Sequence, residues 1–264
     1  MPSKTPINKS MSLISRGIAK LKGRFPVNTF GNDDQILTFL QDPRLYSMIR
    51  WRLFLTQCFV PKVFYDIGAN DPFSPDGQQT VYKPLMPHTD FFLFEAMAKH
   101  EPALIRSKEP YAIAILDEHD GVEKTFYETS AYAPGTGDSL YLERTAFYAS
   151  GALLSSRRTT RRLDSLVEER GWPMPDFIKI DTQGSELDIL RGAPRCLAHA
   201  RALQIECNVQ KYNEGAPLLP EVLAFGQAAG FRLYDVVQFH FNEHKELLQA
   251  DLLVVRSELF DDGW

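Results

Sequence analysis

The chain has 264 residues, of which 44% are hydrophobic and 24% are charged. This length and composition allow one α/β domain with a full core and some additional structure. The formal net charge is −5, which gives no reason to expect a nucleic-acid partner. No apolar run approaches the roughly 18 residues of a transmembrane helix. The three cysteines are widely spaced, fit no zinc pattern and favour a reducing, cytoplasmic compartment.

The N-terminal residues 1–25 are predicted to form a basic arm, because residues 1–24 contain several Lys and Arg and no acid. Residues 11–21 are weakly amphipathic. One interpretation is a helix that makes weak contact with an anionic membrane surface. The other, which the usual behaviour of chain ends favours, is a solvated arm.

Residues 26–60 are predicted to form a helical extension. Two helical patterns, over 33–42 and 44–59, are separated by Pro43. The second pattern has an apolar stripe, which predicts packing against the domain that follows.

From residue 61 to 264, short runs rich in Val, Ile, Leu and Phe alternate with helical patterns. The predicted strands are 62–67, 90–95, 111–116, 176–181, 202–208, 231–237 and 251–256. Such runs are typical of a parallel sheet buried on both faces, with right-handed crossovers.

Turn signals predict how several of these elements end. Gly192 and Gly230 each follow a helical pattern, where a left-handed residue commonly ends a helix. No helix separates the last two strands, which predicts an antiparallel hairpin at the sheet edge. A second hairpin is predicted around 117–121, with 122–127 as its return strand.

The most informative motif ends the first strand, where Asp66 is followed by Gly68, Ala69 and Asn70. An acid and a glycine turn at a strand end are typical of nucleotide-like ligand sites in open α/β sheets. Gly68 allows the main chain to approach a ligand closely. Asp66 can accept hydrogen bonds from a cationic or amine-bearing ligand.

The second and third strands add two candidates. Glu95 ends the second strand 27 residues after Gly68 and precedes Ala96. A carboxylate there can accept both ribose hydroxyls of a nucleoside; the alternative is an acid that stabilises a helix N-terminus. Ile115 is predicted to contact an adenine base, and Asp117 to begin a turn rather than to reach the adenine amine.

The fourth motif runs from Asp176 to Leu187 and places Asp181 at the end of a central strand. With this motif the chain closely resembles the FkbM-type methyltransferases over about residues 61–256. The segments that carry the resemblance are 66–70 (DIGAN), Glu95, 162–166 (RLDSL), 178–186 (IKIDTQGSE) and 190–193 (LRGA).

The resemblance implies a class I methyltransferase, Rossmann-like fold: a mostly parallel seven-stranded sheet with an antiparallel edge strand, formed by residues 61–264. It also implies S-adenosylmethionine as donor and O-methylation of a sugar, glycolipid or small metabolite. The expected cofactor-binding residues are Asp66, Gly68, Ala69, Asn70, Glu95, Ala96, Ile115 and Asp181. The family usually has Gly two residues after Asn70, and this chain has Pro72. The turn 71–77 is therefore predicted to take a different path before its helix.

Transfer to an alcohol also requires removal of a proton by a side chain or a metal. Asp181 is the first candidate for the base, and Glu206 and Asn208, two residues apart on the next strand, are predicted to share its catalytic role. Together these three could offer oxygens to Mg²⁺ or another hard cation. A divalent metal is not favoured, because oxygen ligands without fixed spacing are weak indicators. The alternative is that Glu206 and Asn208 position acceptor hydroxyls.

Other polar and aromatic residues leave two interpretations each. Glu186 either bonds loop amides near its helix start or binds the acceptor. His240 and His244 are predicted to lie in a hairpin link, which does not favour a metal pair. The arginines at 157, 158, 161 and 162 indicate a solvated strand face, or less strongly an acidic acceptor. Region 128–156, with Tyr132, Tyr141, Phe147 and Tyr148, is either a substrate lid or a helical insertion.

Two other functions compete with a small-molecule or glycan methyltransferase. Nucleic-acid methylation is opposed by the acidic net charge and by the lack of a base-amine motif. A non-catalytic partner-binding protein on a methyltransferase scaffold is kept open by Pro72. A Rossmann dehydrogenase is not favoured, because the turn lacks Gly-x-Gly-x-x-Gly spacing.

Overall fold

The computed structural model describes residues 43–129, 137–144, 153–242 and 244–260. The chain divides into two units, residues 1–49 and 50–264. The described part of the first unit is the beginning of helix α3 (Pro43–Gln57). Helix α3 confirms the predicted helix over 44–59. The predicted basic arm 1–25 and the predicted helix 33–42 lie outside the described residues.

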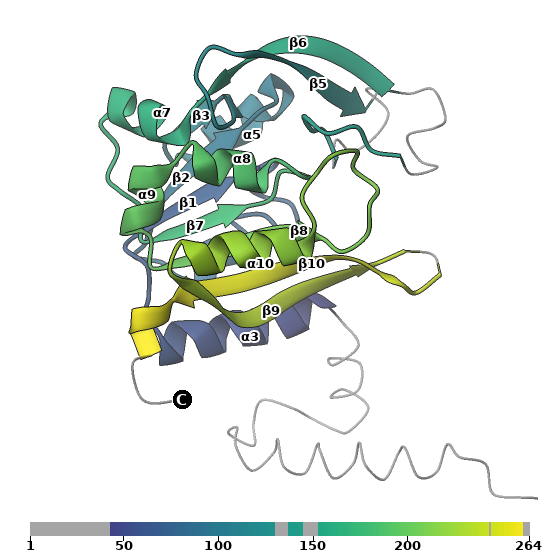
Figure 1. Cartoon of the computed structure of the whole chain (residues 1–264). Coiled ribbons are helices and arrows are strands. Elements are labelled where there is room, and N and C mark those ends of the chain that lie inside the picture. The colour runs from purple at the N-terminus through teal and green to yellow at the C-terminus, as the bar shows by residue number, and fades with distance from the viewer. Residues whose placement is uncertain (1–42, 130–136, 145–152, 243, 261–264) are drawn as a thin grey trace, which may run out of the picture. The chain divides into compact units, whose positions relative to one another are not determined.

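Within the described ranges, seven strands form one sheet in the order β3-β2-β1-β7-β8-β10-β9 (Figure 1). Every neighbouring pair is parallel except that β10 runs antiparallel to β8 and β9. This confirms the predicted mostly parallel sheet with an antiparallel hairpin at its edge. The strands are β1 (Val63–Ile67), β2 (Asp90–Glu95), β3 (Tyr111–Ile113), β7 (Phe177–Ile180), β8 (Ala202–Asn208), β9 (Phe231–Phe241) and β10 (Leu247–Arg256).

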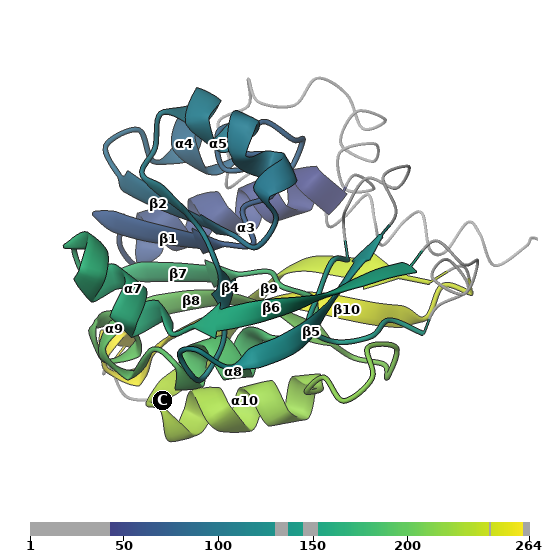
Figure 2. The same ribbon diagram turned by 90° about the horizontal axis from the view of Figure 1, so that it is seen from above.

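Helices cover both faces of this sheet (Figure 2). One face packs against α3 from residue 50 onward, α4 (Tyr82–Leu85), and α5 (Glu101–Ser107), which follows the short 3-10 helix η2 (Ala98–His100). The other face packs against α7 (Leu163–Arg170), α8 (Glu186–Arg191), α9 (Pro194–His199) and α10 (Leu219–Ala228). A 3-10 helix, η3 (Ser257–Phe260), follows β10. None of the helices in these described ranges is long and apolar enough to span a bilayer.

The two packed faces explain why the central strands are mostly apolar. Successive side chains of a strand point to opposite faces, so Phe64 joins one core cluster and Tyr65 the other. Phe64 stacks on Phe177 of β7 with ring centroids 4.8 Å apart, and Trp51 of α3 lies 5.1 Å from Phe177. Because both faces are buried, no alternation with polar residues is needed.

The predicted strand 111–116 is divided between two sheets. Its last two residues form β4 (Ile115–Leu116), which belongs to a separate sheet of order β4-β6-β5. In this sheet β5 (Glu123–Thr129) pairs antiparallel with β6 (Leu153–Arg161), and β4 pairs parallel with β6. The predicted hairpin around 117–121 is therefore wrong. The amides of Asp117 and Gly121 donate to carbonyls of β6. The turn is therefore hydrogen-bonded to β6, and β6 lies between β4 and the predicted return strand, β5.

The two glycines predicted to end helices differ. Gly230 follows α10 with φ +84°, as predicted. Gly192 follows α8 with φ −75°, so the left-handed prediction is wrong there. A Cβ on Gly192 would lie 2.2 Å from the carbonyl oxygen of Asp117. Glycine is needed at this position because two main-chain segments meet there.

Candidate active site

A cavity of about 760 Å³ lies beside the carboxyl ends of β1, β2 and β7. The chain continues from β1 to β2 and β3 on one side, and later to β7 and β8 on the other. Such a reversal of strand order leaves a crevice for a ligand at the carboxyl edge. The predicted residues that line it are Asp66, Gly68, Ala69, Asn70, Glu95, Ala96, Ile115, Asp181 and Glu206. Asn208, predicted to join them, is buried in β8 and does not line the cavity.

Gly68 brings two strand ends into direct contact. Its φ is +81°, and a Cβ there would lie 1.8 Å from the carbonyl oxygen of Asp181. The amides of Gly68 and Ala69 both donate to the carbonyl of Phe94, at 2.9 and 3.0 Å. Only a residue without a side chain fits between β1 and β7 at this point.

Glu95 is buried beside this turn. Its Oε2 accepts from the Asn70 amide at 2.7 Å, and its Oε1 from the Met97 amide at 2.8 Å. Burial raises the pKa of Glu95, and these two hydrogen bonds oppose the increase. Each carboxylate oxygen has a second lone pair, so both can still accept a hydroxyl from a ligand in the cavity.

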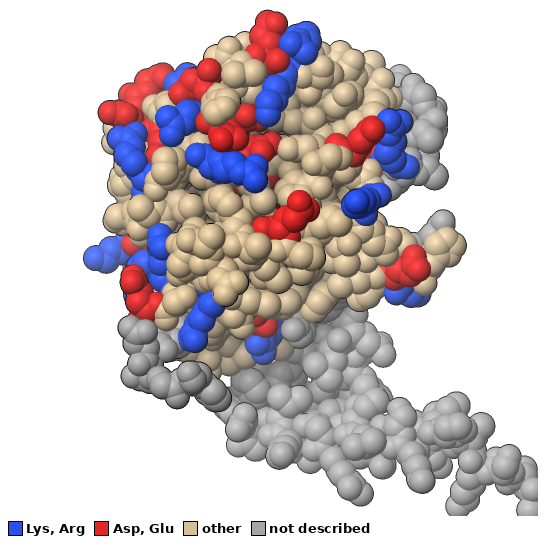
Figure 3. Space-filling model, viewed as in Figure 1, with Lys and Arg blue, Asp and Glu red and all other residues tan. Residues whose placement is uncertain are grey.

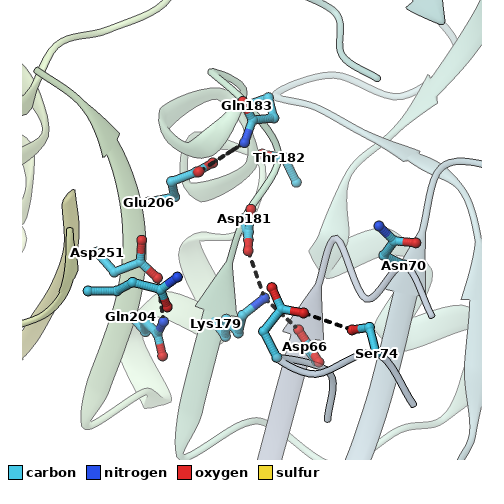
Figure 4. Close-up of polar contacts among 12 residues, drawn as sticks. Asp66, Asn70, Ser74, Lys179, Asp181, Thr182, Gln183, Gln204, Glu206 and Asp251 are labelled. Atoms are coloured by element: carbon cyan, nitrogen blue, oxygen red, sulfur yellow. Dashed lines mark hydrogen bonds and ion pairs between the residues drawn. The ribbon is translucent and has the colours of Figure 1, made fainter. Parts of the chain in front are cut away.

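Lys179 joins two of the predicted acids (Figure 4). Its Nζ lies 3.2 Å from Asp66 Oδ1 and 3.2 Å from Asp181 Oδ2. Lys179 and Asp66 are buried, whereas the Asp181 side chain is 39% exposed. The two neighbouring carboxylates hold the pKa of Lys179 well above its ordinary value against the opposing effect of burial. Asp181 therefore lines the cavity, and one of its oxygens is bound to Lys179, which stays positively charged.

A second polar group lies on the other side of β7, around Glu206 (Figure 4). The Gln183 amide donates to both Glu206 oxygens, at 2.9 and 2.8 Å, and the Gln249 amide donates to Oε1 at 2.7 Å. Burial raises the pKa of Glu206 well above its ordinary range, and the negative charges of Asp181 and Asp251 raise it further. These surroundings therefore favour the neutral form of the Glu206 carboxyl.

Asp251 of β10 lies opposite Glu206 of β8. The Gln204 amide donates to Asp251 Oδ2 at 2.7 Å, and the Tyr82 hydroxyl donates to Gln204 Oε1 at 3.0 Å. Burial raises the pKa of Asp251, as does the charge of Asp181. The cavity therefore contains more acids than cations at its β8–β10 side.

His240 also lies on this side of the cavity. The prediction that His240 lies in a hairpin link is wrong, because β9 extends to Phe241 and β10 begins at Leu247. The pairing of β9 with β10 continues through His240, which is opposite Gln249. His244 lies in the short link as predicted, and does not line the cavity.

Residues 137–144 cross the cavity as an extended strap. The Ser139 hydroxyl donates to the carbonyl of Gln183 at 2.8 Å, and the Asn213 amide donates to the same oxygen at 2.9 Å. These bonds hold Gln183 at φ +59°, an uncommon angle for a residue with a side chain. The Tyr141 hydroxyl donates to Asp188 at 2.6 Å. The described part of the predicted lid is thus not helical.

The remaining predicted lid aromatics, Tyr132, Phe147 and Tyr148, lie outside the described residues. Pro72 lies in a turn, and its carbonyl accepts a hydrogen bond from the Gln79 amide at 2.8 Å. Helix α4 begins only at Tyr82. Ile115 lines the cavity, and Asp117 begins its turn as predicted, accepting from the Glu118 amide at 2.8 Å.

The arginines before Leu163 fit the solvated strand face. On β6, Arg158 pairs with Glu128 at 3.2 Å and Arg161 with Glu169 at 2.5 Å. On the described part of the face in Figure 3, Lys and Arg are interspersed with Asp and Glu. These arginines therefore have acidic partners within the chain.

Glu186 bonds the loop before α8, as one of its two interpretations predicted. Its Oε1 accepts from the Thr182 amide and hydroxyl and from the Gly184 amide, at 3.0–3.2 Å. Burial raises the pKa of Glu186 to about 7, against the effect of these bonds. All three donors use one oxygen, which a glutamine would retain.

Glu186→Gln is therefore expected to stabilise the protein relative to the wild type as pH rises. The folded-state pKa is above the unfolded value, so the favourable contribution of this group is full below pH 4.5 and is lost as pH rises through 7. The difference in unfolding free energy should grow between pH 4.5 and 8 to the order of 3 kcal/mol. Urea unfolding at several pH values measures it. A difference that does not change with pH would contradict the assignment.

Sequence reasoning missed several residues of the site: Tyr82, Lys179, Gln204, Tyr212, Gln249 and Asp251 line it as well. The sequence contains a signal for three of these residues. Lys179, Gln204 and Asp251 are each polar residues inside an otherwise apolar strand. Such residues are rarely buried unless a partner is present.

The sheet order with the reversed strand β10, and the cavity beside β1 and β7, define a class I methyltransferase fold. Residues 66–233 match the methyltransferase FkbM domain. The chain therefore belongs to the FkbM methyltransferase family. A search of curated proteins finds no match.

The chain is similar to several solved methyltransferase structures. The crystal structure of methyltransferase FkbM from Methylobacillus flagellatus is 14% identical, with a TM-score of 0.50 over 86% of this chain and 56% of that chain. This chain thus spans little more than half of that protein. The 1,6-didemethyltoxoflavin-N1-methyltransferase of Burkholderia thailandensis, solved with S-adenosylhomocysteine, is 13% identical with a TM-score of 0.42, covering 97% and 92% of the two chains. Magnesium protoporphyrin IX methyltransferase of Synechocystis, solved with SAM, is 10% identical with a TM-score of 0.43, covering 97% and 100%.

Proposed function

We propose that the chain is an S-adenosylmethionine-dependent O-methyltransferase that acts on a hydroxyl of a sugar, glycolipid or small metabolite. The observation that carries the proposal is the cavity in which the Gly68 turn and the buried Glu95 carboxylate face Asp181 across the strand ends. Family membership supports the reaction class. Residues 61–264 would form the catalytic domain, and the free thiols of Cys58, Cys196 and Cys207 support a reducing, cytoplasmic compartment.

In this proposal the donor lies over β1 and β2. Glu95 accepts the ribose hydroxyls, Ile115 and Ala96 contact the adenine, and the main chain at 68–70 approaches the methionine end. Asp66 does not contact the donor in this proposal and remains paired with Lys179. The acids around the cavity suit a donor that carries a positive sulfonium and ammonium. The S-adenosylmethionine donor supplies the methyl group, and the protein supplies alignment and exclusion of water, which are worth up to about 7–11 kcal/mol in favourable cases.

The acceptor would enter from the β8–β10 side. Its hydroxyl oxygen takes the methyl group while its proton passes to a base, for which Asp181 is the best placed carboxylate. Lys179 holds one Asp181 oxygen, and the Asp181 side chain lines the cavity. The strap at 137–144 lines the cavity with Ser139, Leu140 and Glu143, whereas the Tyr141 ring lies beside Gly184 and does not line the cavity.

The donor assignment is tested by removing the ribose-binding carboxylate. Glu95→Ala is expected to weaken binding of S-adenosylhomocysteine by about 10- to 100-fold, because hydrogen bonds to a charged group contribute about 1.5–3 kcal/mol. The measurement is calorimetric titration of wild type and variant with S-adenosylhomocysteine and with its 2′-deoxy analogue.

The analogue separates a lost contact from a disturbed loop. The wild type should prefer the ribose form, and Glu95→Ala should bind both ligands equally. Glu101→Gln, an acid of α5 that does not line the cavity, should keep the wild-type preference. A variant that still discriminates between the two ligands would exclude Glu95 as the ribose partner. A wild type that binds neither would favour a non-catalytic scaffold.

A further inference from the structure

Three potential metal ligands meet on the β8–β10 side of the cavity. One ligand atom from each of Glu206, His240 and Asp251 lies within 4.8 Å of the other two. They belong to three adjacent strands, β8, β9 and β10. Bonds of about 2.0–2.2 Å to a divalent ion such as Zn²⁺ place two ligand atoms at most about 4.4 Å apart. Small side-chain rotations would therefore close the group around an ion.

We propose that Glu206, His240 and Asp251 bind a divalent cation of the Mn²⁺, Co²⁺ or Zn²⁺ class. The imidazole ligand favours these ions over Mg²⁺ and Ca²⁺, which prefer oxygen ligands alone. This site differs from the ligand set that the sequence suggested, because Asn208 does not line the cavity and His240 does.

The charges at this site lack a counter-ion. The side chains of Glu206 and Asp251 are buried, and neither forms an ion pair within the part of the chain that the structure describes. Lys179, which lines the same cavity, is bonded to Asp66 and Asp181 at 3.2 Å each. Two buried carboxylates without a cation are costly. A divalent ion would offset this cost.

The surroundings of the three side chains would hold them as ligands. Gln183 and Gln249 donate to Glu206, and Gln204 donates to Asp251. Hydrogen bonds of this kind orient metal ligands in known sites. Each carboxylate keeps lone pairs that these amides do not use.

A buried hydroxyl points to a missing partner at the same place. The Tyr212 side chain is only 8% exposed, lines the cavity, and its hydroxyl has no hydrogen-bond partner among the residues described. The residue that follows Tyr212, Asn213, donates to the carbonyl of Gln183 at 2.9 Å, and the side-chain amide of Gln183 donates to Glu206. A water on the bound ion would supply the hydroxyl with its partner.

The site lies on the acceptor side. Gly68 and Glu95 belong to β1 and β2, whereas the three ligands belong to strands across β7. An ion there would polarise the acceptor oxygen and lower the pKa of its hydroxyl. The O–CH₃ bond forms as the S–CH₃ bond breaks, the proton passes to Asp181 or solvent, and the donor leaves as a neutral thioether. This role rests on the proposed function, whereas ion binding itself does not.

The test uses the full chain, stripped with chelator and titrated with Co²⁺, followed by visible absorbance and calorimetry. The wild type should bind one ion per chain. Glu206→Gln, His240→Gln and Asp251→Asn should each lose more than about 100-fold in affinity, and Gln249→Leu about 10- to 100-fold. Glu246→Gln and His244→Gln, exposed positions of the same hairpin, should match the wild type. His240 is the least buried ligand, so its variant is informative even where an acid variant does not fold.

Titration with S-adenosylhomocysteine in parallel separates the two proposals. Both ligands should bind together. A wild type that binds S-adenosylhomocysteine but no Co²⁺ would overturn the metal site and leave the proposed function standing. Co²⁺ binding without S-adenosylhomocysteine binding would support the metal site and contradict the proposed function. Equal Co²⁺ affinity in wild type and His240→Gln would overturn the ligand assignment.

Discussion

Asp181→Asn is expected to slow methyl transfer by about 10²- to 10⁴-fold while leaving the affinity for S-adenosylmethionine within a few-fold. Asp181 directly follows β7 and faces the cavity, with one oxygen held by Lys179 at 3.2 Å. An asparagine can still accept that hydrogen bond, but its amide cannot take the acceptor proton. The loss should therefore fall on the chemical step.

The measurement is single-turnover transfer of a labelled methyl group, together with calorimetric titration of the donor. Asp90→Asn serves as the control, because Asp90 is exposed at the start of β2, at the end of the strand away from the cavity. Equal losses in rate and in donor affinity would make Asp181 a donor-binding residue. An unchanged rate would assign the base to another group.

Lys179→Met is expected to lower the free energy of unfolding by about 3–5 kcal/mol at neutral pH. Lys179 is buried with Asp66, and both Asp66 and Asp181 lie 3.2 Å from its Nζ. Methionine keeps the approximate shape of the side chain and removes the charge. The buried Asp66 carboxylate is then left without a cation, which is the costly part of the change.

The pH dependence identifies the mechanism of this loss. Burial already raises the pKa of Asp66, and Lys179 opposes the increase. Without the lysine, the folded-state pKa moves further above the unfolded value, so stability is retained at low pH and is lost as pH rises through the raised pKa. Denaturant unfolding should show a larger deficit at pH 8 than at pH 4.

A second substitution provides the strongest control for this prediction. Asp66→Asn combined with Lys179→Met should recover much of the lost stability, because replacing both members of a buried pair is often nearly neutral. Lys211→Met, at an exposed position, should stay within about 0.5 kcal/mol of the wild type. A double variant as unstable as the single one would show that packing, not charge, causes the loss.

The sheet was predictable because its strands are buried on both faces. Runs such as 91–94 and 252–255 are apolar without interruption, and this pattern depends on few distant contacts. Strand β6 was not predicted as a partner of β4 and β5. Its sequence carries Ser, Arg and Thr on an exposed surface, and it pairs with β5, with β4 and, through two main-chain hydrogen bonds, with the turn at 117–121. Such non-local bonds leave no periodic signal in a single sequence.

Local motifs at the ends of β1, β2, β7 and β8 predicted Gly68, Glu95, Asp181 and Glu206, whereas the cavity residues of β9 and β10 were not predicted. Gly68 and Glu95 follow strands in patterns tied to one kind of ligand. Asp251 and His240 belong to strands that come late in the chain and meet Glu206 only through sheet order. The prediction included Asn208 instead, because it was based only on the alternation of side chains along the strand that contains Glu206. Register between strands decides which polar residues face each other.

The seam between Gly68 and the carbonyl of Asp181 has no room for even a methyl group. The loop proposed to approach the donor and the residue proposed to act on the acceptor are therefore packed directly against each other. Because of this contact, Asp181 cannot change position to accommodate a different acceptor. Variation in β9 and β10, which lie across β7 from Gly68 and Glu95, would leave the proposed donor contacts unchanged.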